Sequence, residues 1–233
     1  MNKRTKVVLL AAFVFCLLPS ALHAARLHTS GFETNNLIAT EWNSIPTQNG
    51  TLAVDATTPR SGTYNLDVAQ GGTGGRNLLE RAVTATVKTS GTLFGCFGFR
   101  IVTAPATFPH TIFAWRNVGS SASGGGPVEV RLTTGPKLQI YNTLTATATD
   151  GTTTLSTATW YVVCEKVTIS DTVGVIELRL DNGVEATQTN VDTLDGANGF
   201  TKFGLGGQAL ARANWEYRFD DVKVNDETGT FET

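Results

Sequence analysis

The residues with the chemistry of a polar site stand in three Glu-x-Arg pairs. They are Glu129/Arg131, Glu177/Arg179 and Glu216/Arg218. Side chains two residues apart on a strand point to the same face of a sheet, so each pair places a carboxylate beside a guanidinium. Two interpretations remain open: ion pairs on a solvated face, or a polar groove that binds sugar hydroxyls or uronates.

Aromatic side chains are the second kind of candidate. Trp115 stands beside Arg116 and Asn117 near a predicted loop, and an exposed indole can stack on a sugar ring. The alternative is that Trp115 is buried, as we expect for Trp160 and Trp215, which alternate with apolar neighbours. The ligand-binding residues predicted from the sequence are Trp115, Arg100, Arg131 and Tyr141.

Catalytic motifs are not recognisable in the sequence. A G-x-S-x-G nucleophile motif is absent, and the glycine-rich stretches lack the lysine and helix of a phosphate-binding loop. Beyond the first 24 residues only His28 and His110 remain, which leaves no zinc-binding cluster. We therefore predict no catalytic residue.

The first 24 residues have the layout of a secretory signal peptide. Lys3, Arg4 and Lys6 precede an uncharged apolar run from Val7 to Leu18, and Ala24 offers a small residue for cleavage. The run is shorter than the roughly 20 residues that span a bilayer, so an uncleaved membrane anchor is the less favoured alternative. The sequence predicts a secreted protein, periplasmic or extracellular, with one domain over residues 25–233.

The composition limits the partners of that domain. Charged residues make up 16% of the chain and the net charge is −2, so no basic excess suggests nucleic acid. A second apolar stretch is absent, so we expect no membrane insertion of the mature chain. The sequence does not indicate the oligomeric state.

Two cysteines, Cys96 and Cys164, remain after removal of Cys16 with the signal peptide. An even pair in an oxidising compartment favours a disulfide. The alternative is two buried free thiols.

The mature chain reads as β-structure almost throughout. Period-two alternation is interrupted by Gly, Thr, Ser and Asn, as in a β-sandwich or barrel, and Asp181-Asn182-Gly183 carries the Asn-Gly signature of a tight hairpin. The fold class predicted is all-β, a two-sheet antiparallel jelly-roll sandwich. The expected strands are Leu52–Asp55, Tyr64–Ala69, Leu78–Thr86, Leu93–Val102, Thr111–Asn117, Val128–Thr133, Lys137–Tyr141, Trp160–Ile169, Val175–Asp181, Thr201–Gly206 and Trp215–Val224.

The order of several motifs resembles a known superfamily. Phe32-Glu33, Arg60 to Leu66, Thr159 to Val163, Leu178 to Gly183 and Phe219 to Val224 follow one another as in the concanavalin A-like lectin/glucanase superfamily, in its laminin-G-like and pentraxin-like branch. The resemblance covers about residues 31–226. It implies a lectin-like sandwich and a bond between Cys96 and Cys164. The E-x-D-x-x-E run of the glucanases is absent here.

Metal sites of the superfamily carry over only in part. The loops that match the pentraxin calcium site, Gly124–Pro127 and Gly206–Leu210, contain no carboxylate. The resemblance implies a different, structural calcium ion held by Glu33, the Gly62 backbone and Asp220 or Asp221. Calcium takes about six to eight oxygen ligands, so the alternative is that these carboxylates cap turns or pair with cations.

The leading functional prediction is a secreted lectin-like domain that binds a glycan or other surface polymer without catalysis. One alternative is a jelly-roll polysaccharide lyase or glycoside hydrolase; the candidate residues for the lyase are Arg76, Glu80, Arg81, His110 and Tyr141. Another is a structural or adhesive envelope protein.

Overall fold

The structure is a computed structural model that describes residues 26–37, 41–43, 50–70, 77–83, 87–117, 126–207 and 214–231. These residues form two antiparallel sheets and one short 3-10 helix, η2 (Gly196–Asn198). The predicted all-β, two-sheet antiparallel sandwich is confirmed. The predicted signal peptide, residues 1–24, lies outside the described residues.

Sheet A has eight strands in the order β12-β11-β10-β5-β14-β3-β2, with β1 paired to β14. Its strands are β1 (Arg26–Ser30), β2 (Thr51–Asp55), β3 (Asn65–Gln70), β5 (Gly91–Thr103), β10 (Trp160–Ile169), β11 (Gly174–Leu180), β12 (Gly183–Val191) and β14 (Trp215–Asn225). Because β5 and β14 are neighbours, segments more than a hundred residues apart in the sequence form the middle of this sheet.

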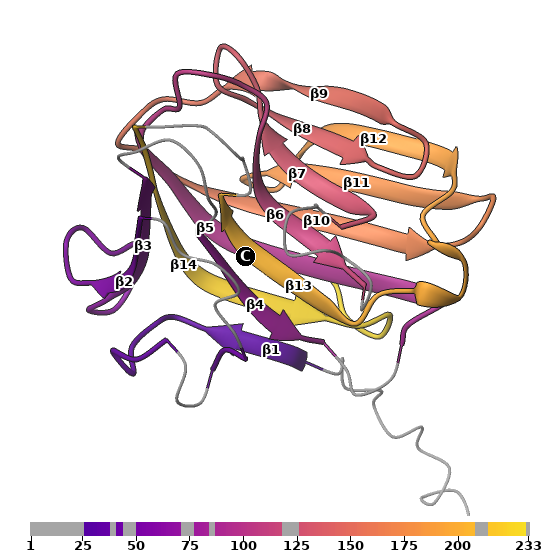
Figure 1. The fold of residues 1–233 in the computed structure, drawn as a ribbon, viewed down its shortest axis with the longest axis horizontal. Coiled ribbons are helices and arrows are strands. Elements are labelled where there is room, and N and C mark those ends of the chain that lie inside the picture. The colour runs from indigo at the N-terminus through magenta and orange to yellow at the C-terminus, as the bar shows by residue number, and fades with distance from the viewer. Residues whose placement is uncertain are drawn as a thin grey trace, which may run out of the picture.

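Sheet B has six strands in the order β4-β13-β6-β7-β8-β9. They are β4 (Asn77–Ala82), β6 (His110–Arg116), β7 (Val128–Leu132), β8 (Lys137–Asn142), β9 (Thr147–Thr154) and β13 (Lys202–Gly207). Figure 1 shows the two sheets lying one over the other, with the chain passing repeatedly between them.

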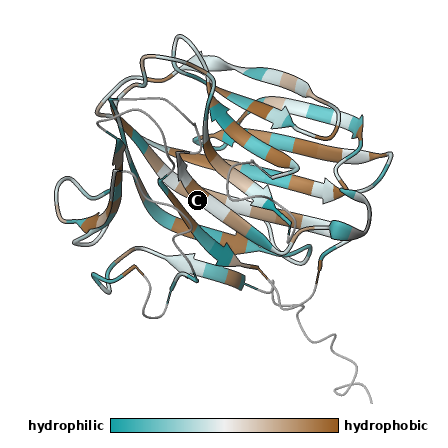
Figure 2. Cartoon of the chain, in the orientation of Figure 1, coloured by the Kyte–Doolittle hydropathy of each residue, from teal (hydrophilic) through white to brown (hydrophobic). Residues whose placement is uncertain are grey.

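The core fills the space between the sheets with the inward half of each alternating strand. Phe97, Phe99 and Ile101 of β5 are at most 1% exposed. Val128 and Val130 of β7 are fully buried opposite them in sheet B. Figure 2 shows the resulting bands of hydrophobic and hydrophilic residues alternating along the strands. This alternation is what a two-layer antiparallel sandwich requires.

All eleven predicted strands are present, but three observed strands were not predicted. β9 reads TATDGTTT and β12 reads GVEATQTNV, so neither carries the apolar alternation of a strand with one buried face. Both are edge strands, and side chains join them: the Glu185 carboxylate accepts hydrogen bonds from the amides of Thr152 and Thr153 at 2.8 and 3.0 Å. The third, β1, directly follows the predicted signal peptide.

The predicted tight hairpin joins β11 to β12, one residue earlier than expected. Leu180 pairs with Gly183, so the two turn residues are Asp181 and Asn182. Their φ angles are 46° and 72°, as a two-residue turn of the primed type requires. Asn and Asp tolerate this left-handed region better than most residues, which is why glycine is not needed at either position.

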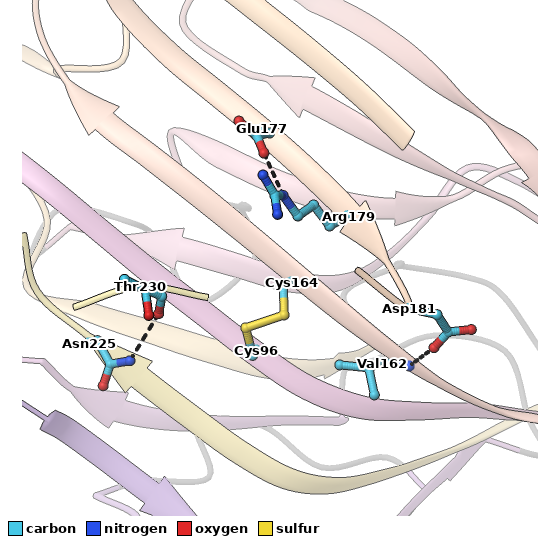
Figure 3. Close-up of a disulfide and its surroundings, with 8 residues drawn as sticks. All are labelled: Cys96, Val162, Cys164, Glu177, Arg179, Asp181, Asn225 and Thr230. Atoms are coloured by element: carbon cyan, nitrogen blue, oxygen red, sulfur yellow. Dashed lines mark hydrogen bonds and ion pairs between the residues drawn. A yellow bond between two sulfur atoms is a disulfide. The ribbon is translucent and has the colours of Figure 1, made fainter. Parts of the chain in front are cut away.

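The predicted disulfide between Cys96 and Cys164 is confirmed. The two residues are direct cross-strand partners on β5 and β10, with Cα atoms 4.1 Å apart. Figure 3 shows the bond joining these strands, near the Glu177–Arg179 pair on β11. Both cysteines point away from the core, yet they are only 3% and 2% exposed.

The C-terminal segment explains this burial. Beyond β14 the chain turns back, with the Asn225 side chain donating to the Thr230 carbonyl at 3.3 Å. The Phe231 ring then contacts the Phe94 ring on β5, at 5.3 Å between centroids, and lies 4.3 Å from the Arg179 guanidinium on β11. Because β10 lies between β5 and β11, Phe231 crosses β10 next to Cys164.

Candidate functional site

The outward side of sheet B carries a continuous set of polar side chains, here called the polar face. Cross-strand register places these side chains in two rows. One row contains Glu80, Glu129 and Tyr141, with the small residues Gly204 and Ala114 between Glu80 and Glu129. The next row contains Thr111, Arg131, Gln139 and Asp150. Directly opposed side chains lie about 5 Å apart in such rows. The polar face is defined by Glu80, Thr111, Arg116, Glu129, Arg131, Gln139, Tyr141, Asp150 and Lys202.

One half of the polar face is a buried ion-pair network centred on Glu80. Its carboxylate lies 2.8 Å from the Arg116 guanidinium and 3.1 Å from the Lys202 ammonium group. Burial lowers the pKa of Arg116, while Glu80 and Glu129 act in the opposite direction. A buried guanidinium is tolerated only when it is paired. In this half of the face, Glu80 therefore compensates the charges of Arg116 and Lys202.

The other half presents a guanidinium in a fixed position. The Glu129 carboxylate, 2% exposed, accepts hydrogen bonds from the Thr111 hydroxyl at 2.6 Å and from Arg131 Nε at 2.7 Å. The Arg131 guanidinium lies 3.4 Å from the centroid of the Tyr141 ring. In the described part of the chain no group accepts a hydrogen bond from its two Nη atoms. The Arg131 side chain is 19% exposed.

The four residues predicted to bind a ligand do not form one site. Arg131 and Tyr141 are adjacent on the polar face, as described above. Trp115 is fully buried and packs against Phe113, with 5.2 Å between ring centroids. Its indole is therefore not exposed to a ligand, which agrees with the alternative that Trp115 is buried. Arg100 points outward from sheet A, on the opposite side of the sandwich.

Arg100 instead holds a loop of its own chain. Its guanidinium and that of Arg218 both donate to the Thr58 hydroxyl. The Trp160 indole donates to the Thr58 carbonyl at 3.1 Å, so Trp160 lies on this outer surface and the expectation that it belongs to the core was wrong. These three residues are cross-strand neighbours in one row of sheet A.

The residues proposed for a lyase are also dispersed. His110 is fully buried, with Nδ1 2.9 Å from the Tyr217 hydroxyl in the core. Arg81 pairs with Phe203 and points to the opposite side of β4 from Glu80. Glu80 and Tyr141 lie on the polar face, and Arg76 lies outside the described residues.

Several residues of the polar face were missed by the sequence analysis. Arg116 follows Trp115 and therefore points the opposite way; once Trp115 is placed in the core, alternation alone assigns Arg116 to the outer surface. Thr111, Gln139, Asp150 and Lys202 carried no comparable signal, because their grouping depends on which strands are neighbours.

The residues of the predicted calcium site all contact the turn formed by residues 60–64. Glu33 accepts hydrogen bonds from the amides of Thr63 and Tyr64, at 3.0 and 3.1 Å. Gly62, with φ 61°, passes so close to this carboxylate that a Cβ atom would lie 2.3 Å from Glu33 Oε1. The turn therefore needs glycine at this position.

Asp220 and Asp221 bind the start of the same turn. Asp220 is fully buried and accepts from the amides of Arg60 and Ser61, at 2.9 and 3.1 Å. Asp221 pairs with the Arg60 guanidinium at 2.5 Å. Burial raises the pKa of Asp220 to about 6, although its amide donors act against this.

This donor set does not by itself form a metal site. The oxygens of Glu33 and Asp220 face N–H groups, and the described residues hold no cluster of three or more His, Cys, Asp or Glu able to bind a metal. Calcium at this position stays a prediction.

Comparison with known proteins places the fold but not the family. No family model matches the sequence, and no curated protein matches it. Among solved structures, the chain is similar to the cellulose-induced protein Cip1 (TM-score 0.62, 18% identity, covering 84% of this chain and 95% of that one). It is also similar to an endo-β-1,4-glucuronan lyase from Trichoderma reesei (TM-score 0.59, 17% identity, covering 84% and 98%).

Two further similar structures have other activities in their descriptions. One is a carbohydrate esterase from the Shiga toxin-encoding bacteriophage phi24B (TM-score 0.61, 11% identity, covering 87% of this chain and 99% of that one). The other is the receptor-binding domain of botulinum neurotoxin D (TM-score 0.59, 13% identity, covering 88% and 50%). At these identities the similarity shows the jelly-roll fold alone, and it does not single out the laminin-G-like or pentraxin-like branch.

Proposed function

We propose that this protein binds a glycan on the polar face of sheet B without catalysis. The observation that carries the proposal is Arg131, whose guanidinium is fixed by Glu129 and by the Tyr141 ring while neither Nη group has an acceptor among the described residues. A preorganised guanidinium loses little side-chain entropy when it binds, because its orientation is already set. Its planar pair of donors suits vicinal hydroxyls or a carboxylate.

The state of the carboxylates supports binding rather than hydrolysis. Glycoside hydrolysis uses two carboxyl groups about 5–10 Å apart on either side of the scissile bond. In the described part of the polar face, Glu80 and Glu129 are almost fully buried and each is paired with a cation. Asp150 is exposed, but it accepts a hydrogen bond from Gln139 at 2.6 Å.

A polysaccharide lyase is the second candidate. Arg131 and Tyr141 are in contact, and such a pair combines a cation for a uronate carboxylate with a phenol for proton transfer. The likeness in fold to a glucuronan lyase favours the same idea, while the burial of His110 does not.

The proposed setting is outside the cytoplasm. The Cys96–Cys164 bond fits an oxidising compartment, and the described residues include no helix long and apolar enough to cross a membrane. A periplasmic or extracellular glycan is therefore the partner that we propose.

Affinity electrophoresis in gels that contain neutral or uronate polysaccharides tests the proposal. The Arg131→Lys variant keeps the charge but loses the planar donors, and Arg179→Lys is the matched control, because Arg179 also binds a Glu two residues earlier, at 2.6 Å. We expect retention of the wild type, loss of retention in Arg131→Lys only, and no new ends on the polysaccharide. Unsaturated uronate products would establish the lyase instead, and equal mobility in all gels would overturn both.

A further inference from the structure

A pocket of about 280 Å³ opens beside Arg131 at one end of the polar face. It is lined by Phe108, Pro109, Thr133, Thr134, Gln139 and Asp150. Gln139 is the direct cross-strand partner of both Arg131 and Asp150. The pocket is therefore continuous with the surface that we propose to bind a glycan.

The lining has two chemically different walls. Phe108 and Pro109, just before β6, form an apolar wall. Gln139 and Asp150 form the polar wall, and the Gln139 amide donates to Asp150 Oδ1 at 2.6 Å. This bond uses one of the two N–H donors of the amide, and it leaves Asp150 Oδ2 and the Gln139 carbonyl oxygen as acceptors that have no partner among the described residues. A sugar ring has the matching surfaces: C–H groups on its faces, and hydroxyl donors around its edge.

The charge of the lining separates neutral from acidic sugars. Asp150 is the one charged residue among the six that line the pocket. The positive charge of the neighbouring Arg131 is offset by the Glu129 carboxylate, 2.7 Å from its Nε atom, and Lys137, on the same strand as Gln139, is not part of the lining. A ligand carboxylate would meet the Asp150 carboxylate, whereas a hydroxyl would donate to it.

We propose that this pocket is a subsite for one neutral hexose residue of the bound glycan, with Asp150 as the residue that selects against uronates. The volume of about 280 Å³ lies just below the range of ligand pockets, which is about 300–1,000 Å³, and so suits a single ring. The inference rests on the proposed glycan binding and specifies the class of sugar in one part of the same site.

The experiment uses matched ligands that differ only at C6 of each sugar. Titration calorimetry on the full chain compares the tetrasaccharides of β-1,4-glucan and β-1,4-glucuronan, and those of β-1,4-mannan and β-1,4-mannuronan. The wild type should bind the neutral member of a pair about tenfold more tightly than the acidic member, roughly the effect of one unfavourable charge contact. Asp150→Asn should bring this ratio close to one.

Asp171→Asn is the control, because Asp171 is also exposed but lies in the turn between β10 and β11. It should leave the ratio unchanged. An equal or inverted preference in the wild type, no binding of any of the four tetrasaccharides, or an unchanged ratio in Asp150→Asn would overturn the pocket assignment. The gel assay decides the proposed function separately, because retention that depends on Arg131 can persist without this preference.

Discussion

Each sheet carries a Glu-x-Arg pair with its arginine on an aromatic ring, but the two pairs have different surroundings. On sheet B, Arg131 binds Glu129 and stacks on Tyr141, which belongs to the neighbouring strand. On sheet A, Arg179 binds Glu177 and contacts Phe231, which comes from the C-terminal segment. The same local chemistry therefore holds the C-terminal segment on one face, and on the other it fixes an arginine whose Nη groups have no acceptor among the described residues.

This contrast extends over both outer faces. The outer face of sheet A is occupied by its own chain: the Thr57–Thr58 loop on Arg100 and Arg218, the turn of residues 60–64 on Asp220, and Phe231 beside the disulfide. The polar face of sheet B holds side-chain pairs with a pocket at one end. The outer face of sheet A should therefore respond to mutation mainly in stability, and the Arg131 half of the polar face mainly in binding.

Removal of the disulfide should have the largest effect. The bond closes a loop of 68 residues, and loss of such a bond typically costs about 2–5 kcal/mol. The double variant Cys96→Ala/Cys164→Ala should lose stability of this order in urea unfolding, while its folded form keeps glycan binding. A loss below about 1 kcal/mol would contradict the importance given to sheet A, and a parallel loss of binding would contradict the independence of the faces.

The ionisation of Glu165 should change the free energy of unfolding of the whole sandwich, because this residue lies between the two sheets. Glu165 is fully buried between the sheets, and burial raises its pKa to about 8, although the polar N–H group of the nearby Trp115 indole opposes the shift and Glu129 adds to it. The unfolded chain loses this proton near pH 4.5 and the folded chain only near pH 8, so the free energy of unfolding should fall as pH rises between these values.

The measurement is clearest between pH 6.5 and 8. Asp67 and Asp220, whose pKa values are raised to about 6, titrate mainly below this window. His28, whose pKa is lowered from 6.5 to about 4, still binds protons in the unfolded chain near pH 6.5, so it adds a small rise in stability at the lower end of the window. Glu165 can account for a fall of at most about 2 kcal/mol over the window. Glu165→Gln should remove this fall in urea unfolding. Equal slopes in variant and wild type would show that this carboxyl is not the titrating group.

The cover over the disulfide gives a smaller and more local effect. Phe231→Ala removes the ring that crosses β10, so dithiothreitol should reduce the Cys96–Cys164 bond several-fold faster under native conditions. Arg179→Lys should have the same effect to a lesser degree, and Arg131→Lys should have none. Arg179→Lys should therefore have the larger effect on reduction of the disulfide, whereas Arg131→Lys should have the larger effect on glycan binding. Unchanged reduction in Phe231→Ala would mean that the sheet alone protects the bond.

The sequence predicted those features that depend on local pattern. Alternation identified the core of β5, β7, β11 and β14, and export with an even cysteine count favoured the disulfide. It did not predict β9 and β12, whose stability as strands comes from edge pairing rather than from apolar side chains. Nor could the sequence show that Arg100 and Arg131 lie on opposite outer faces, because the side of the sandwich on which each lies depends on the order of strands in space.

The site was predictable to the same limited extent. Arg131 and Tyr141 were found because both are strand residues with outward chemistry, and their contact arises from register between β7 and β8. Asp150 and Gln139 approach each other only because β9 pairs with β8. The strand β9, which has no apolar pattern, therefore supplies Asp150, the charged residue of the pocket.

Calcium should have the smallest effect on the contrast between the faces. The predicted ligands, Glu33, Gly62, Asp220 and Asp221, all hold the turn of residues 60–64 on sheet A, and the two carboxylates of Glu33 and Asp220 already accept amide hydrogen bonds. A bound ion would add stability only by exceeding these contacts, because a ligand stabilises the folded state according to its own affinity. We expect a small rise in melting temperature on addition of calcium, reversed by a chelator and absent in Asp220→Asn. A melting temperature that the chelator leaves unchanged would mean that the amide hydrogen bonds hold this turn without a metal.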